Sequence, residues 1–239
     1  MSGLPIRVSG LAKRFGSVEA VVDATFTAEA GRVTGFVGPN GAGKSTTLRM
    51  LLGLTRPDRG IASFGETPYR DLAAPTGTVG AVLDIAAAHP AATARGHLRT
   101  FGDLGGHPRE RVDRVIDAVD LGGYADRRVK GFSTGMRQRL ALATALLGDP
   151  GVLVLDEPSN GLDPAGIVWL RTFLRDFAAS GRTVLVSSHV LTELQYSIDD
   201  LVLIDHGRIA WSGSLPDFTE HGGTLEEAFL ALTAKEPTA

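Results

Sequence analysis

The stretch GPNGAGKST, residues 38–46, is the feature that most constrains the fold of this chain. It fits the pattern G-x-x-x-x-G-K-[ST] and stands between a β-branched apolar run, residues 33–37, and a helix-like segment, residues 45–52. Glycines let the backbone wrap around a phosphate, and the helix N-terminus adds partial positive charge. In such a unit Lys44 would neutralise the β- and γ-phosphates of a nucleotide, and the Ser45 hydroxyl would ligate Mg²⁺. The alternative is a glycine-rich turn that merely precedes a lysine.

Short apolar runs alternate with longer helix-like segments along most of the chain. Residues 33–37, 152–155, 183–186 and 201–204 are the expected strands, and a turn at 205–208 leads to another at 209–211. This alternation predicts an α/β fold with a mostly parallel sheet. Residues 6–8 and 21–27 are expected to form a small antiparallel β layer beside that sheet.

A helical insertion is expected between the two parts of the sheet. Strand signals are absent from residues 85–147, where 93–104, 108–121 and 134–147 have the apolar spacing of helices. The chain is therefore predicted to be one domain, 1–239, with a core of residues 1–84 and 148–215. The helical subdomain is residues 85–147, and a short C-terminal helix and tail, residues 216–239, include a helix at 224–234.

Composition excludes several classes of function. The chain has 239 residues, a formal net charge of −3 and no cysteine. It thus lacks the overall basic field that holds nucleic acid, so no nucleic acid partner is expected, and it can form neither disulfides nor thiolate zinc sites. No apolar stretch approaches the roughly 20 residues of a membrane-spanning helix. A cytoplasmic protein that does not itself cross a membrane is expected.

Two carboxylates follow the apolar run at residues 152–155. Asp156 and Glu157 stand at a buried strand end, where a carboxylate is costly unless it is paired or meets a cation. Beside a phosphate loop, Asp156 is expected to hold Mg²⁺ and Glu157 to act as general base or to orient water. The alternative is two acids that cap a strand. Asp163 and Pro164 also fit the N-cap and first position of a helix, a role compatible with a functional one.

These motifs, in this order, resemble the nucleotide-binding subunit of ATP-binding cassette (ABC) transporters over about residues 8–233. GPNGAGKST resembles the Walker A motif, VLVLDEP the Walker B motif with its catalytic glutamate, and SNGLD, residues 159–163, the D-loop. The resemblance implies an ATPase with ATP and Mg²⁺ as cofactors. The nucleotide-binding residues that it implies in the Walker A loop are Gly38, Pro39, Asn40, Gly41, Ala42, Gly43, Lys44, Ser45 and Thr46.

FSTGMRQRL, residues 132–140, stands at the family signature, usually written LSGGQ. In the family two subunits face each other head to tail, and the signature loop of one covers the γ-phosphate held by the other. Phe132, Thr134 and Met136 depart from the commonest residues. Without a nucleotide across the gap, Ser133 would simply cap a helix. The residues expected to meet the partner's ATP are Ser133, Thr134, Gly135, Met136 and Asp163.

Three further residues take their expected roles from the resemblance. Phe15 stands where the family has an aromatic residue that stacks on adenine, and the alternative is a buried core phenylalanine. His189 stands at the switch histidine, expected to contact the γ-phosphate and to join Lys44 and Glu157 in catalysis. Asp84 replaces the usual metal-contacting glutamine; it is one methylene shorter and charged, so it could ligate Mg²⁺ or fail to reach it. The remaining histidines are expected at the surface or in loops: His89, His97, His107, His206 and His221.

The resemblance also implies partners. A second ABC ATPase chain, identical or related, would complete each site, and a polytopic membrane permease would dock on the helical insertion and attach the chain to the inner face of the membrane. The motif wording is most similar to the branch that exports drugs, antibiotics or lantibiotics. Two alternatives stay open: a soluble ABC-type ATPase that acts on DNA or ribosomes, and a nucleotide-dependent regulatory binding module.

Overall fold

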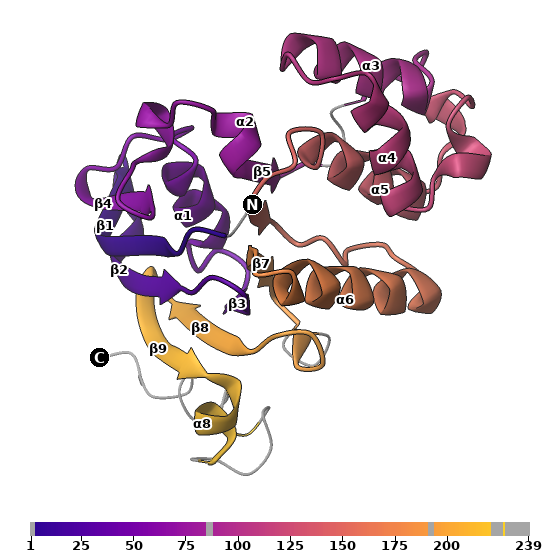
Figure 1. The fold of residues 1–239 in the computed structure, drawn as a ribbon. Helices are drawn as coiled ribbons and strands as arrows, with labels where there is room; N and C mark the ends of the chain where they lie inside the picture. The colour runs from indigo at the N-terminus through magenta and orange to yellow at the C-terminus, as the bar shows by residue number, and fades with distance from the viewer. Residues whose placement is uncertain (1–2, 85–87, 191–193, 221–226, 228–239) are drawn as a thin grey trace.

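The computed structural model describes residues 3–84, 88–190, 194–220 and 227, and within them a nine-stranded sheet forms the frame of the molecule (Figure 1). The strand order is β4-β1-β2-β9-β8-β3-β7-β6-β5. The strands are β1 Ile6–Phe15, β2 Val18–Ala28, β3 Val33–Val37, β4 Arg59–Phe64, β5 Val79–Val82, β6 Val152–Leu155, β7 Thr183–Ser188, β8 Asp200–Asp205 and β9 Arg208–Ser214. The helices are α1 Lys44–Leu51, α2 Pro75–Thr78, α3 Ala94–Leu104, α4 Glu110–Ala118, α5 Thr134–Ala145, α6 Pro164–Ala179 and α8 Leu215–Glu220.

The sheet confirms the expected α/β fold. Strands β8, β3, β7, β6 and β5 are parallel to one another, whereas β9 is antiparallel to β8. Strand β1 pairs antiparallel with both β2 and β4, as expected for the N-terminal β layer. This layer continues the main sheet, because β2 meets β9 at the pair Asp23 and Arg208.

The central strands are buried on both faces, because a hydrophobic core lies on each side of the sheet. In β3, Val33 and Val37 belong to one core and Phe36 to the other. Helix α1 covers the Phe36 side with Leu48, and α6 covers the opposite side with Leu174. This two-sided burial explains why these strands are continuous apolar runs without polar alternation.

Helices α3, α4 and α5 lie between β5 and β6 in the chain and form a group beside the sheet in Figure 1. Thr93 begins α3 as its N-cap, since its Oγ1 accepts a hydrogen bond of 3.0 Å from the N–H of Gly96. The three helices fall within the segments predicted from apolar spacing. The division into subdomains at particular residues stays a prediction.

The structure differs from the sequence-based expectations at several places. His97 was expected at the surface but is buried, since α3 turns it toward α5, where its Nε2 lies 3.1 Å from Thr144 Oγ1. Strands β4 and β5 and helix α8 are short and carry no periodicity strong enough to predict them. The helix expected at residues 224–234 lies outside the described residues, apart from Glu227. None of the described helices is both long and apolar enough to span a membrane.

Candidate active site

The candidate site lies at the carboxyl ends of three adjacent parallel strands. The loop of residues 38–43 follows β3, Asp156 and Glu157 follow β6, and His189 follows β7, which lies between the other two. In open α/β sheets ligands bind outside the carboxyl ends of the strands. Sheet topology therefore brings together residues that are more than 100 positions apart in sequence.

The loop after β3 has a backbone that requires glycine. Gly43 has a φ of 105°, and a Cβ there would lie 2.4 Å from the carbonyl oxygen of Ala20. We find no hydrogen bond from the N–H of Gly41 or Gly43 to another group in the described part of the chain. These donors, beside the N-terminus of α1, suit a phosphate group.

Lys44 begins α1, and its side chain is buried within this loop. Its Nζ donates hydrogen bonds to the carbonyl oxygens of Gly38, at 2.7 Å, and Pro39, at 3.2 Å. The same Nζ lies 3.4 Å from Oε1 of Glu157. A buried ammonium group needs such partners, and a phosphate would be a further one.

Glu157 joins Lys44 to His189. Its Oε2 lies 2.8 Å from Nδ1 of His189 and accepts a longer bond, 3.3 Å, from the His189 N–H. Glu157 has a φ of 49°, a left-handed conformation that is costly for a residue with a Cβ. Such strain persists where surrounding structure holds it, and it aims this carboxylate between the lysine and the histidine. The three residues proposed for catalysis thus form one contiguous cluster.

Ser187 is a site residue to which the sequence analysis assigned no role. Its Oγ donates to Oδ1 of Asp156 and accepts a bond of 3.0 Å from the N–H of Glu157. One hydroxyl therefore orients both carboxylate residues. The sequence contains a signal for it, because hydroxyl groups in a fully buried strand such as β7 need hydrogen-bond partners.

The donor set fits Mg²⁺ bound together with a nucleotide. No group of three or more His, Cys, Asp or Glu residues suited to a metal occurs within the described ranges of the chain. Asp156 and the hydroxyl of Ser45 are oxygen ligands of the kind that Mg²⁺ takes, and Mg²⁺ usually binds one or two carboxylates plus substrate phosphates. The chain's own residues would hold this ion only in part.

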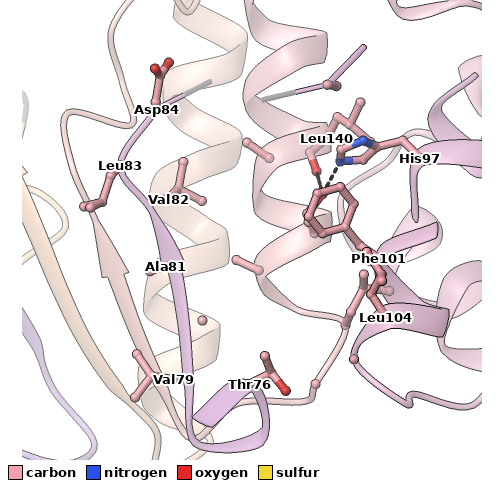
Figure 2. A pocket seen from close by; sticks show the side chains of 18 of the residues that line it. Thr76, Val79, Ala81, Val82, Leu83, Asp84, His97, Phe101, Leu104 and Leu140 are labelled. Atoms are coloured by element: carbon pink, nitrogen blue, oxygen red, sulfur yellow. Dashed lines mark hydrogen bonds between the residues drawn. The ribbon is translucent and has the colours of Figure 1, made fainter. Parts of the chain in front are cut away.

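Asp84 lies one strand farther along the same edge. It comes two residues after β5, which pairs with β6. Asp156, directly after β6, donates its N–H to the carbonyl oxygen of Val82 at the end of β5. Figure 2 shows Asp84 just beyond the end of β5. A contact between Asp84 and the metal stays a prediction.

Phe15 is exposed at the end of β1, with 51% of its surface accessible, so the alternative of a buried core phenylalanine is wrong. Lys13 Nζ lies 5.4 Å from the centre of the ring and is held by Asp58, at 2.8 Å. An exposed aromatic face is what stacking on a base requires.

The signature loop, residues 132–136, and the D-loop, residues 159–163, begin α5 and α6. Both caps are confirmed: Ser133 Oγ accepts from the N–H of Met136 at 3.3 Å, and Asp163 Oδ1 accepts from the N–H of Gly166 at 2.7 Å. Within the described residues, neither loop makes an ion pair or side-chain hydrogen bond with Lys44, Glu157 or His189. The D-loop does meet the cluster through the backbone, since the N–H of Asn160 donates to the carbonyl oxygen of Glu157 at 3.2 Å.

A pocket of about 520 Å³ lies between the edge strand β5 and helices α3 and α5 (Figure 2). Its apolar walls come from both sides, and Leu104 stands 78% exposed among them. Thr144 Oγ1 donates to the carbonyl oxygen of Leu140, so His97 Nε2 is the donor to Thr144. Burial lowers the pKa of His97, which agrees with a neutral ring.

Known proteins are similar to this chain in sequence and in fold. The family model described as "ABC transporter" matches residues 21–160. The "Nod factor export ATP-binding protein I" of Ralstonia nicotianae is 39% identical over 223 residues, 90% of this chain and 69% of that protein. The "Bacitracin transport ATP-binding protein BcrA" of Bacillus licheniformis is 37% identical over 207 residues, 85% and 68% of the two chains. A solved "ATP binding subunit of ABC transporter" superposes with a TM-score of 0.84 at 27% identity, covering 95% of this chain and 98% of that one.

Proposed function

The chain belongs to the ABC transporter family and is an ATPase of that family, and we propose that it powers a separate membrane subunit that exports a drug, an antibiotic or a peptide. The observation that carries the chemistry is the cluster of Lys44, Glu157 and His189 beside the glycine loop. Its carboxylate, Glu157, lies within ion-pairing distance of the buried ammonium group of Lys44 and within hydrogen-bonding distance of the imidazole of His189.

Each residue of the cluster has a role that its geometry supports. Lys44 would shift from the loop carbonyls to the β- and γ-phosphates and neutralise their charge. Glu157, already held by Ser187 and His189, would orient the attacking water and accept its proton. His189 would donate to the γ-phosphate, and Phe15 would stack on adenine. A bound Mg²⁺, held by Ser45 and Asp156, would supply further charge neutralisation.

The second group of motif residues supports a dimer. In the described part of the chain, the side chains of Ser133 and Asp163 form no hydrogen bond or ion pair with Lys44, Glu157 or His189, while the exposed Ser133 caps α5, whose N-terminus suits an anion. We infer that they meet the ATP of a second ABC chain, identical or related. Thr134 and Met136, which replace the usual residues, would lie at the same interface.

The pocket between β5 and the helices supports a membrane partner. Its apolar walls, with Phe101 and Leu104 exposed on α3, suit an amphipathic segment of a permease. Such docking would attach the chain to the inner face of the membrane, and Asp84 at the rim would connect the docked segment to the nucleotide. The export direction rests on the names of the relatives, which are export and bacitracin transport proteins.

The variant Glu157→Gln tests the proposed mechanism. It keeps the shape of the side chain but removes the proton acceptor, so ATP binding should persist while phosphate release falls about a hundredfold or more. ATP, but not ADP, should then convert the variant into a dimer on size-exclusion chromatography. Glu66→Gln is the matched control, because Glu66 is an exposed carboxylate that pairs with Arg7. Unaltered phosphate release by Glu157→Gln would refute the assignment of Glu157.

A further inference from the structure

The signature loop and the D-loop touch each other within the subunit. Gly161 has a φ of 74°, and a Cβ there would lie 2.7 Å from Cγ2 of Thr134. A Cβ on Gly135 would lie 3.3 Å from Cδ2 of Leu162. Thr134, one of the residues that departs from the family signature, thus packs its methyl group directly on the D-loop. The two loops are in contact at their tips.

A second contact joins the helices that these loops begin. The guanidinium carbon of Arg139, five residues into α5, lies 3.9 Å from the ring centre of Trp169 on α6. Attraction between an arginine and an aromatic face extends to about 6 Å, so this is a close pair. Arg139 Nη1 also donates a bond of 2.8 Å to the carbonyl oxygen of Val119, at the end of α4. Arg139 is therefore fixed from two sides.

The aromatic face of α6 continues away from this pair. Trp169 stacks on Phe173 with ring centres 5.7 Å apart, and Phe173 on Phe177 at 6.1 Å. The guanidinium carbon of Arg182 lies 5.0 Å from the centre of the Phe177 ring. A stripe of three rings thus has an arginine at each end.

The arginine at the far end leads back to α5. Arg182 pairs with Asp149 at 3.1 Å, and Asp149 also pairs with Arg111 at 3.3 Å. Arg111 Nη2 donates to the carbonyl oxygen of Leu146, which ends α5. Burial disfavours the charged form of Asp149, but Arg111 and Arg182 outweigh it and lower the pKa of the carboxyl. The Phe177 end of α6 is therefore connected to the carboxyl end of α5 indirectly, through Arg182, Asp149 and Arg111 of α4.

We propose that Arg139 and Trp169 are positioning residues. They fix the position of the signature loop relative to the D-loop, so that both loops can contact the partner's ATP at the same time. This inference rests on the proposed function, because it assumes an ATP-dependent dimer. Two loops that must contact one nucleotide at the same time lose less conformational entropy on association if their relative position is already fixed. Neither side chain is expected to touch the nucleotide.

The test compares dimer formation in variants that carry Glu157→Gln as a common background. Arg139→Met removes the charge and the hydrogen bond but keeps an unbranched stem, and Trp169→Leu removes the ring. Each should raise the ATP concentration for half-maximal dimerisation about tenfold, and the double variant should be no worse than either single one. Trp169→Phe, which keeps an aromatic face, should stay close to the parent.

A matched control comes from the same helix. Arg171 stacks on Tyr196 at 4.8 Å, so Arg171→Met removes an arginine–aromatic pair of α6 that does not involve α5. ATP affinity of each monomer, measured at a protein concentration too low for dimers, should equal that of the parent. A purely structural role would change the melting temperature without changing the ATP dependence of dimerisation.

Three results would overturn the inference. They are an unchanged or lowered ATP requirement in Arg139→Met and Trp169→Leu, an equal rise in Arg171→Met, and strictly additive effects in the double variant. A parent that forms no dimer with ATP would instead refute the proposed dimeric mechanism, and the inference with it.

Discussion

At the scale of single residues, the site depends on a strained backbone conformation and on an aromatic side chain that is exposed, although aromatic side chains are usually buried. Glu157 holds a left-handed backbone, and Ser187 supplies the hydroxyl that secures it. Phe15 leaves half of its surface in water at the exposed end of β1. Such costs are ordinary at functional sites, because ligand contacts recover them when the ligand binds.

Phe15→Ala should weaken ATP binding about tenfold, since stacking of a base on an aromatic ring is worth about 1–3 kcal/mol. Folding should be unaffected, because the side chain is mostly exposed. Titration calorimetry with ATP measures the effect. Phe15→Tyr keeps the ring and should bind as the wild type does; equal affinity in the alanine variant would exclude stacking.

At the scale of elements, two helices meet through one buried histidine. His97 of α3 donates to Thr144 of α5, and its ring centre lies 4.6 Å from that of Phe101. Apolar spacing predicted both helices, whereas the expectation that His97 lies at the surface came from its lack of metal-ligand spacing and was wrong. The apolar spacing of α3 shows which face of the helix is buried, but not which element packs against it. The packing of α3 against α5 therefore decides that His97 becomes buried.

The buried ring predicts a pH dependence of stability. Burial lowers the pKa of His97 below about 6.5, its value in the unfolded chain. The stability that the neutral His97 ring contributes to the free energy of unfolding is therefore fully present above that pH. It is lost as the pH falls toward the lowered pKa, because the unfolded state takes up the proton more readily. Urea unfolding at pH 7.5 and 5.0 should show a larger loss for wild type than for His97→Gln.

The difference should approach about 1.4 kcal/mol per pH unit at most, the limit for one proton. The other ionisable groups at the pocket, among them Asp84, His107 and Arg137, are present in both proteins and cancel in the comparison. Parallel pH curves for the two proteins would mean that His97 titrates in the folded state as it does in the unfolded chain.

At the scale of the whole molecule, the sheet separates three surfaces. The catalytic cluster lies at the carboxyl ends of β3, β6 and β7, whereas the pocket lies against the outer strand β5 (Figures 1 and 2). The contact of α5 with α6 lies between the helical group and the core. Each surface is assembled from segments distant in sequence, so each depends on the complete fold.

Leu104→Asp should reduce recovery of a membrane partner when the chain is affinity-purified from detergent-solubilised membranes. A charge at the exposed rim of the pocket changes the free energy of unfolding of the free chain by no more than about 0.5 kcal/mol, but it opposes burial of that rim against a partner. The basal ATPase rate should not change. Leu54→Asp, at another largely exposed leucine that does not line the pocket, is the control. Equal recovery with both variants would place the membrane contact elsewhere.

Much of the fold follows from the sequence because its signals are local. A short apolar run rich in valine, such as residues 152–155, favours a buried strand, and a serine or aspartate before helical spacing, as at Ser133 and Asp163, favours a helix cap. The glycine-lysine loop is equally local, since one strand, one turn and one helix determine its geometry. These features identified the family as well as the α/β fold.

The tertiary structure decided what depends on distant segments. Short strands such as β4 and β5 exist because neighbouring strands supply their hydrogen bonds, and the ion pair of Lys44 with Glu157 exists because β3 and β6 flank β7. Likewise, nothing near Arg139 in the sequence indicates Trp169, which is 30 positions away. Spacing determines local backbone and chemistry, whereas long-range packing decides which side chains meet.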